Sequence, residues 1–182
     1  PISSVTDLSH IIEYVNRMIS ENNLTITGSY FSKYTNQIPL LIFVYGFTKI
    51  GSIFGTTNVL LMGTIFNALF IAITGYFIYL IGKEIKGPKA GLLSLIFMVI
   101  NPIFYLYTSY FYTDTLCMPF AVIGLYLMIK SIKADNTKNK ILLSILSGLI
   151  FFIGLKVRIV VIILLIAIVG FILKKKKIVD KL

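Results

Sequence analysis

The chain has 182 residues, of which 57% are hydrophobic and 13% are charged, and its formal net charge is +10. Soluble domains have about 25% charged residues, so this chain has roughly half of the usual complement. A soluble domain of this size cannot bury so much apolar surface, which excludes a soluble enzyme, a nucleic-acid-binding module and a disordered regulator. We therefore predict an integral membrane protein.

Residues 1–37 form the only long polar stretch. Within it, apolar residues recur at helical spacing from Val5 to Ile19, which predicts a surface helix over about 5–22. The chain starts at Pro1 rather than at Met, and it lacks the basic start and small-residue cleavage site of a signal peptide. We expect it to be an internal piece of a longer protein.

The apolar run from Ile38 to Phe54 has two interpretations. A spanning helix here would put residues 1–37 in the cytoplasm, but that stretch lacks the excess of Lys and Arg typical of cytoplasmic segments. The run is also interrupted by Lys49 and by glycines. We therefore expect an interfacial or re-entrant juxtamembrane helix within an extracytoplasmic unit of residues 1–56, with a spanning helix as the alternative.

Five further apolar runs in residues 57–182 are long enough, or nearly so, to cross about 30 Å of hydrocarbon as helices. They cover residues 57–82, 90–109, 114–130, 140–155 and 158–173. The Lys-rich loops at 83–89, 130–140 and 174–182 hold most of the basic residues, which places these loops in the cytoplasm. The predicted fold is thus an all-α, polytopic helical bundle in the plasma membrane, with juxtamembrane helices on its extracytoplasmic side.

Two acidic residues stand apart from the cytoplasmic lysines. Asp7 begins the predicted surface helix, and Asp114 begins a predicted span directly after an aromatic turn. By the topology above, both carboxylates lie on the extracytoplasmic side, where two converging carboxylates could hold a divalent cation or divide acid and base roles. The alternative is that each only caps a helix N-terminus, where a negative charge is favourable.

Two basic residues, Lys156 and Arg158, interrupt an otherwise apolar stretch from Ile141 to Leu173. They could form a cationic clamp for a phosphate at the outer membrane surface, because the Arg fork suits bidentate contact. They could equally mark a tight turn and extend to lipid headgroups.

Aromatic residues concentrate around Tyr34 and from Phe104 to Tyr112. They are typical of a membrane-interface belt, and stacking against sugar rings is the functional alternative. The single cysteine, Cys117, lies in an apolar run, so the sequence contains neither a disulfide framework nor a Cys-based metal site.

The order of these features resembles a known family. It consists of Asp7, the segment YFSKYTNQIP over residues 30–39, an apolar run that ends in Gly55, the segment KEIKG over 83–87, Asn101-Pro102, and Tyr112-Thr113-Asp114. This order is similar to the N-terminal part of polytopic glycosyltransferases that use lipid-phosphate sugars. They comprise glycosyltransferase family 39 with the protein O-mannosyltransferases and the lipid A aminoarabinose transferases. The resemblance covers roughly residues 1–173.

The resemblance implies the C-type glycosyltransferase fold and assigns roles by position. Asp7 would be the catalytic base or help to hold a metal, and Asp114 would organise the metal, Mg²⁺ or Mn²⁺, or the substrate. Lys156, Arg158, Tyr34 and Tyr112 would bind the lipid phosphate and its sugar. Many members have two adjacent acids in the first loop, whereas Leu8 follows Asp7 here, which leaves the division of acid and base roles open.

The predicted activity is transfer of a sugar, of the hexosyl or mannosyl type, from a polyprenyl-phosphate donor to an extracytoplasmic acceptor. That acceptor could be a cell-envelope polymer, a lipid or a protein. Two other classes remain open: a transporter or flippase of a lipid-linked saccharide, and a non-catalytic membrane subunit. A transporter is expected to have charged residues deep within its spans, whereas here they lie at the span ends.

Overall fold

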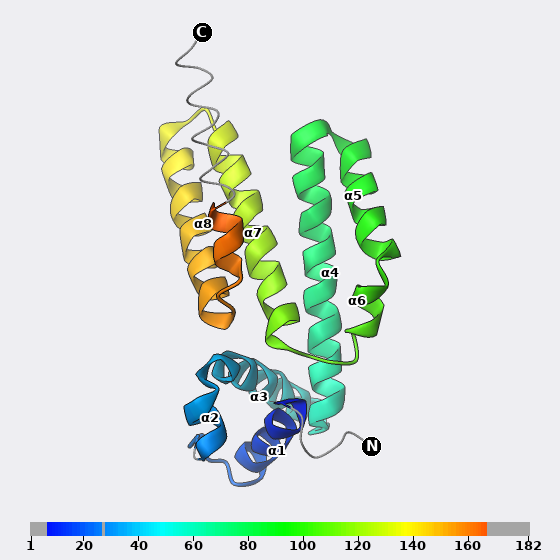
Figure 1. The fold of residues 1–182 in the computed structure, drawn as a ribbon, viewed down its shortest axis with the longest axis vertical. Helices are drawn as coiled ribbons and strands as arrows, with labels where there is room; N and C mark the ends of the chain where they lie inside the picture. The colour runs from blue at the N-terminus through cyan, green and yellow to red at the C-terminus, as the bar shows by residue number, and fades with distance from the viewer. Residues whose placement is uncertain (1–6, 27, 167–182) are drawn as a thin grey trace.

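The computed structural model of the chain describes residues 7–26 and 28–166, and regular structure in these residues is entirely helical (Figure 1). The elements in chain order are α1 (Asp7–Ser20), α2 (Ser29–Lys33), the 3-10 helix η1 (Thr35–Gln37), α3 (Ile38–Ile53), α4 (Val59–Lys86), α5 (Pro88–Ile100), α6 (Pro102–Leu106), α7 (Thr113–Lys133) and α8 (Thr137–Val157). Residues 161–166 are also helical.

Three helices, α4, α7 and α8, are long and apolar enough to cross a membrane. Helix α7 packs against both α4 and α8. Only 22–33% of the most apolar stretch of each helix is buried inside the protein. The remaining apolar side chains face outward, as expected for helices that are solvated by lipid. The predicted all-α membrane bundle is confirmed.

The predicted span over 90–109 is divided between two helices. Helix α5 ends at Ile100, and α6 begins at Pro102 after Asn101, whose backbone is extended. A residue before proline is disfavoured in the helical conformation, which accounts for the break. Helix α5 alone is a shorter apolar helix. It packs along α4 so closely that a Cβ atom on Gly91 would lie 2.6 Å from the Tyr79 carbonyl oxygen.

Helix α3 lies across one end of the bundle instead of running alongside the spans (Figure 1). It contacts α4, α7 and α8, and α1 packs against it and against the start of α4. Leu41 and Val44 of α3 are fully buried, whereas Ile53 and Phe54 are 79% and 82% exposed. This position matches the juxtamembrane interpretation of the run. The side of the membrane on which residues 1–56 lie, and a division of the chain at residue 56, stay predictions.

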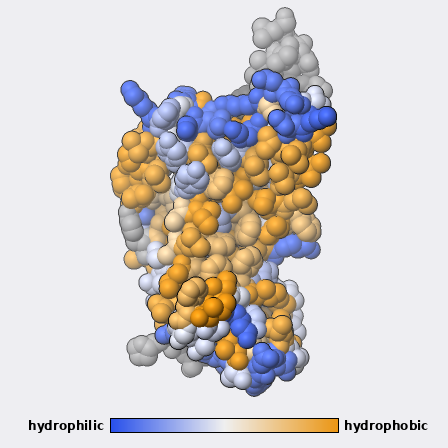
Figure 2. All heavy atoms as spheres, turned by 180° about the vertical axis from the view of Figure 1, so that it is seen from behind, coloured by the Kyte–Doolittle hydropathy of each residue, from blue (hydrophilic) through white to orange (hydrophobic). Residues whose placement is uncertain are grey.

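The two ends of the bundle differ in charge. One end carries lysines in the α4–α5 turn, at the end of α7 and at the start of α8, and we call it the lysine end. The opposite end contains α1–α3, and we call it the α3 end. Figure 2 shows a hydrophilic band at the lysine end and hydrophobic surface along the spans. The lysines are Lys83, Lys86, Lys89, Lys130, Lys133, Lys138 and Lys140. Of the predicted span 158–173 and the loop 174–182, residues 167–182 lie outside the described residues.

A buried amide on α4 fixes the loop that leads into α7. Asn67 is 1% exposed, and its side-chain nitrogen donates to the carbonyl oxygens of Tyr107 at 2.6 Å, Thr108 at 3.0 Å and Tyr110 at 3.3 Å. One turn earlier on α4, the Phe111 ring lies directly over Gly63, where a Cβ atom would come within 2.3 Å of the ring. Loop 107–112 is therefore held at a defined place on α4, and this sets the position at which α7 begins.

We predict that Asn67→Leu lowers the free energy of unfolding by about 1–3 kcal/mol, because the Tyr107, Thr108 and Tyr110 carbonyl oxygens lose their hydrogen bonds from the Asn67 amide. Thr74→Val is the matched control, because the buried Thr74 hydroxyl donates only to the Phe70 carbonyl of its own helix. Thermal unfolding in detergent micelles measures both variants. Equal melting temperatures for the two would contradict a structural role of Asn67.

Candidate functional site

The first residue of α1, Asp7, is hydrogen-bonded to α2. The Tyr30 hydroxyl donates to Asp7 Oδ1 at 2.8 Å. The Tyr30 ring is in turn stacked on His10, with 4.3 Å between ring centroids, and lies 5.1 Å from the Tyr34 ring. One carboxylate oxygen of Asp7 is thus held by a phenol, whose ring packs against His10 of α1 and against Tyr34, the residue that follows α2.

The environment of Tyr30 keeps its phenol protonated. Burial raises the pKa of Tyr30 well above its ordinary value, and the hydrogen bond to Asp7 and the negative charge of that carboxylate raise it further. A phenol that stays neutral at any physiological pH is a permanent hydrogen-bond donor. Tyr30 therefore acts as a donor that orients the Asp7 carboxylate.

The second acidic residue, Asp114, lies in the first turn of α7 and is paired with a cation. Arg158 Nε lies 3.0 Å from Asp114 Oδ1, and Arg158 Nη1 donates to Thr113 Oγ1 at 2.9 Å. The guanidinium therefore joins the end of α8 to the start of α7. The Asp114 side chain is 50% exposed and that of Arg158 is 34% exposed. An ion pair this exposed contributes about 0–1 kcal/mol to the free energy of unfolding, so its main effect is to orient the two side chains.

Tyr112 links the two acids electrostatically. It is the N-cap residue of α7, and the Thr115 hydroxyl accepts a hydrogen bond from its backbone N–H. Burial raises the pKa of Tyr112, and the negative charges of Asp7 and Asp114 raise it further. Asp7 is the first residue of α1 and Asp114 lies in the first turn of α7, and both helices start at the α3 end of the bundle (Figure 1). The structure thus brings Asp7, Tyr112 and Asp114 to one region.

A cavity of about 420 Å³ lies between η1 and the end of α8. Asn36, Lys156 and Arg158 supply its polar lining, and aliphatic side chains such as Leu155 and Val160 supply the rest. The Lys156 ammonium lies 5.4 Å from the centre of the Phe152 ring. A cavity with two cations and an aliphatic wall can accept a phosphate that carries an apolar chain.

The residue next to this cavity lining has an unsatisfied polar atom. Gln37 is 4% exposed, and its Oε1 atom has no hydrogen-bond partner in the part of the chain that the structure describes. Both Gln37 and Tyr30 lie in the segment 30–39 that carries the resemblance, but the sequence assigned a role to neither. The role of Tyr30 depends on its contacts with Asp7 and His10 of α1, which no local pattern predicts.

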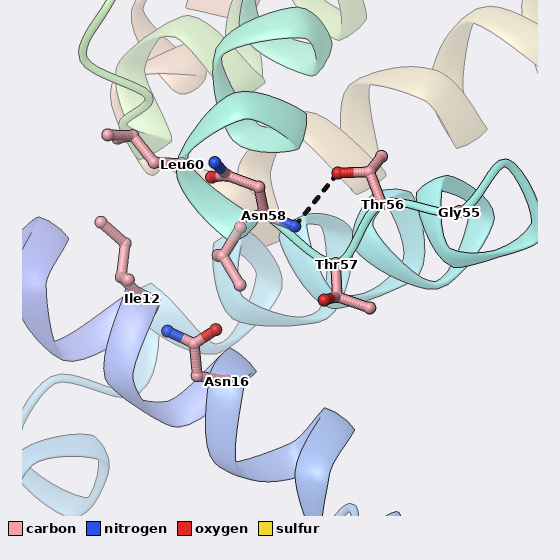
Figure 3. A pocket seen from close by; sticks show the side chains of 8 residues that line it. Ile12, Asn16, Gly55, Thr56, Thr57, Asn58 and Leu60 are labelled. Carbon is pink, nitrogen blue, oxygen red and sulfur yellow. Dashed lines mark hydrogen bonds between the residues drawn. The ribbon is translucent and has the colours of Figure 1, made fainter.

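Another cavity has a different chemistry. It measures about 490 Å³, lies between α1 and the start of α4, and Figure 3 shows Asn16, Thr57 and Asn58 among its lining. Its lining contains no charged side chain. The Asn58 side chain caps α4 by accepting from the Leu61 N–H at 3.0 Å. This cavity therefore offers neutral hydrogen-bonding groups and no acid or base.

The two carboxylates are a small donor set for a metal ion. No group of three or more His, Cys, Asp and Glu side chains within residues 7–26 and 28–166 could hold one. Mg²⁺, however, is commonly held by one or two carboxylates together with substrate phosphate and water. The contacts above engage one carboxylate oxygen of Asp7 and one of Asp114, and a cation shared by the two side chains stays a prediction.

A family model described as dolichyl-phosphate-mannose-protein mannosyltransferase matches residues 33–181. The chain belongs to this family. The resemblance inferred from the sequence is confirmed, and with it a membrane glycosyltransferase of the type that takes its sugar from a dolichyl-phosphate donor. Comparison with curated proteins and with solved structures finds no match.

The matched region contains five of the candidate site residues: Tyr34, Tyr112, Asp114, Lys156 and Arg158. Asp7 and Tyr30 precede it. The case for Asp7 as a site residue in this member of the family therefore depends on the geometry described above, and its role stays a prediction.

We predict that Asp7→Asn lowers the pKa of Tyr30, because it removes the negative charge beside the phenol. The pKa should stay above its ordinary value, since burial is the largest cause of the shift. NMR of the chain labelled with ¹³C at the tyrosine ζ carbons measures the titration, with Tyr30→Phe to assign the signal. Glu13→Gln, on an exposed position of α1, is the control that should leave the titration unchanged. An unaltered Tyr30 titration in Asp7→Asn would contradict the contact.

Proposed function

We propose that this chain carries the donor-phosphate site and the catalytic carboxylates of a plasma-membrane glycosyltransferase, with the site on the extracytoplasmic side. It transfers a sugar from a polyprenyl-phosphate donor to an extracytoplasmic hydroxyl acceptor. The observation that supports this most is the ion pair of Asp114 with Arg158, a cation that also lines the basic cavity at the end of α8.

In the proposed complex the donor phosphate lies in the basic cavity. Lys156 and Arg158 neutralise its charge, and the aliphatic wall of the cavity contacts the polyprenyl chain. Arg158 also contacts Asp114 and Thr113, so the phosphate is positioned relative to the start of α7. Tyr34 and Tyr112 lie at the same end, and in this proposal they pack against the sugar ring.

The reaction is a displacement at the anomeric carbon. The acceptor oxygen forms a bond to this carbon while the bond from the carbon to the phosphate oxygen breaks, and polyprenyl phosphate leaves with the electron pair. Asp7, oriented by Tyr30, takes the proton from the acceptor hydroxyl. A single displacement inverts the anomeric configuration. A divalent cation, Mg²⁺ or Mn²⁺, held by Asp7 and Asp114 would stabilise charge on the leaving phosphate.

We expect Asp7→Asn and Asp114→Asn each to lower sugar transfer at least 100-fold, because a positioned carboxylate contributes about 10²–10⁴-fold to such a step. The full-length protein in its native membrane is assayed for transfer from polyprenyl-phosphate sugar, and its abundance is measured in parallel. Glu13→Gln is the matched control. Full transfer by both aspartate variants would contradict the catalytic assignment and favour helix capping or the transporter alternative.

The two basic residues are expected to respond differently. Lys156→Gln should raise the KM for the lipid donor, because it removes one phosphate contact. Arg158→Lys should lower kcat more than it raises KM, because a lysine lacks the rigid planar fork with which the guanidinium contacts Asp114 through Nε and Thr113 through Nη1. Steady-state kinetics in lipid nanodiscs separates the two effects. Lys49→Gln serves as control, since Lys49 is an exposed lysine of α3, and unchanged donor KM in Lys156→Gln would contradict the phosphate site.

A further inference from the structure

A second charged crevice lies at the lysine end, on the opposite side of the bundle from the candidate active site. It occupies about 420 Å³ between the end of α4 and the α7–α8 pair. Its lining includes Glu84, Lys130, Lys133, Asn139, Leu142 and Leu143. The proposed glycosyl transfer uses none of these residues, so the crevice requires a separate explanation.

Two lysines share one carboxylate in this crevice. Lys130 Nζ lies 3.6 Å from Glu84 Oε1, and Lys133 Nζ lies 3.6 Å from Glu84 Oε2 and also donates to the Glu84 carbonyl oxygen. Both lysine side chains are nearly half exposed, whereas that of Glu84 is 26% exposed. An ammonium has three N–H donors, so each lysine keeps donors for a further acceptor. The crevice therefore has a positive charge in excess of its own carboxylate.

The surroundings strengthen this positive field. Five further lysines lie at the same end of the bundle: Lys83, Lys86, Lys89, Lys138 and Lys140. Among the described residues of these loops, Asp135 is the only acid besides Glu84. An anion near the membrane surface is attracted to such a cluster, by about 1 kcal/mol for each lysine that lies close to it.

One wall of the crevice is fixed. The Ser131 side chain is 2% exposed, and its hydroxyl donates to the Lys140 carbonyl at 2.9 Å and lies 2.7 Å from the Ser144 hydroxyl. These contacts join the end of α7 to the start of α8. The lysines of α7 and the leucines of α8 are thus held as one surface opposite Glu84.

The crevice continues into an apolar strip on α8. Leu142 lines the crevice and is 56% exposed, and Ile145 and Leu149, one and two turns further along the same face, are each 56% exposed. The strip is exposed along one face of α8, a helix long enough to span the membrane. A molecule with an anionic head and aliphatic chains can therefore contact the lysines and the strip at once, which a free anion cannot do.

We propose that this crevice binds the headgroup of an anionic phospholipid of the adjacent leaflet. The phosphate is contacted by Lys130 and Lys133, and the acyl chains lie along the exposed face of α8. Glu84 holds both ammonium groups in place and at the same time competes with the lipid phosphate for them. Headgroup binding here does not depend on the proposed glycosyl transfer at the other end.

The test compares lipids retained by the full chain in nanodiscs of phosphatidylcholine with increasing phosphatidylglycerol, detected by native mass spectrometry. We expect the double variant Lys130→Gln/Lys133→Gln to retain phosphatidylglycerol at least tenfold more weakly. The matched control Lys86→Gln/Lys89→Gln has the same change in net charge outside the crevice lining and should differ from the original chain by much less. Equal losses in the two double variants would overturn the proposal.

A second variant gives the opposite expectation and does not depend on loss of fold. Glu84→Gln removes the competing carboxylate, so it should strengthen phosphatidylglycerol retention severalfold. Weaker retention by a folded Glu84→Gln protein, or release of the lipid by millimolar inorganic phosphate alone, would overturn a lipid site. The second outcome would indicate a site for free phosphate.

Discussion

The structure depends on a solvent constraint: hydrocarbon offers no hydrogen bonds to the backbone, so every spanning segment must satisfy its own N–H and C=O groups. Helices α4, α7 and α8 are long and apolar enough to span, and most of their apolar stretches face outward. The charged side chains of these three helices lie in their first and last turns. One end carries carboxylates, phenols and an arginine between α1, α7 and α8, and the other carries lysines grouped around Glu84.

The loops between helices therefore determine where the polar side chains at the bundle ends lie. Loop 107–112 is short, yet Asn67 binds three of its carbonyl oxygens from within α4. The start of α7, with Tyr112 and Asp114, is thereby positioned from a neighbouring helix. Arg158 adds a second attachment from the end of α8. Arg158 and Asp114, which come from distant parts of the chain, are thus brought together by contacts at the bundle end.

Much of the architecture was accessible from the sequence. Composition and the lengths of the apolar runs predicted an all-α membrane bundle, and the order of short motifs predicted the family that the match over residues 33–181 shows. The interruption of the run from Ile38 to Phe54 predicted a helix that differs from the spans, and α3 does lie across the bundle end. The break at Asn101 was not anticipated, although the following proline is its physical cause.

The sequence by itself determined the solvent, the helical class and the family, because these follow from composition, run length and motif order, which are local properties of the chain. Only the tertiary structure decided that Tyr30 holds Asp7, that Arg158 joins Asp114 to Thr113, and that Glu84 lies between two lysines. These contacts join residues 23 to 49 positions apart. Their existence depends on how helices pack, and packing is set by the joint shape of many side chains that no local pattern records.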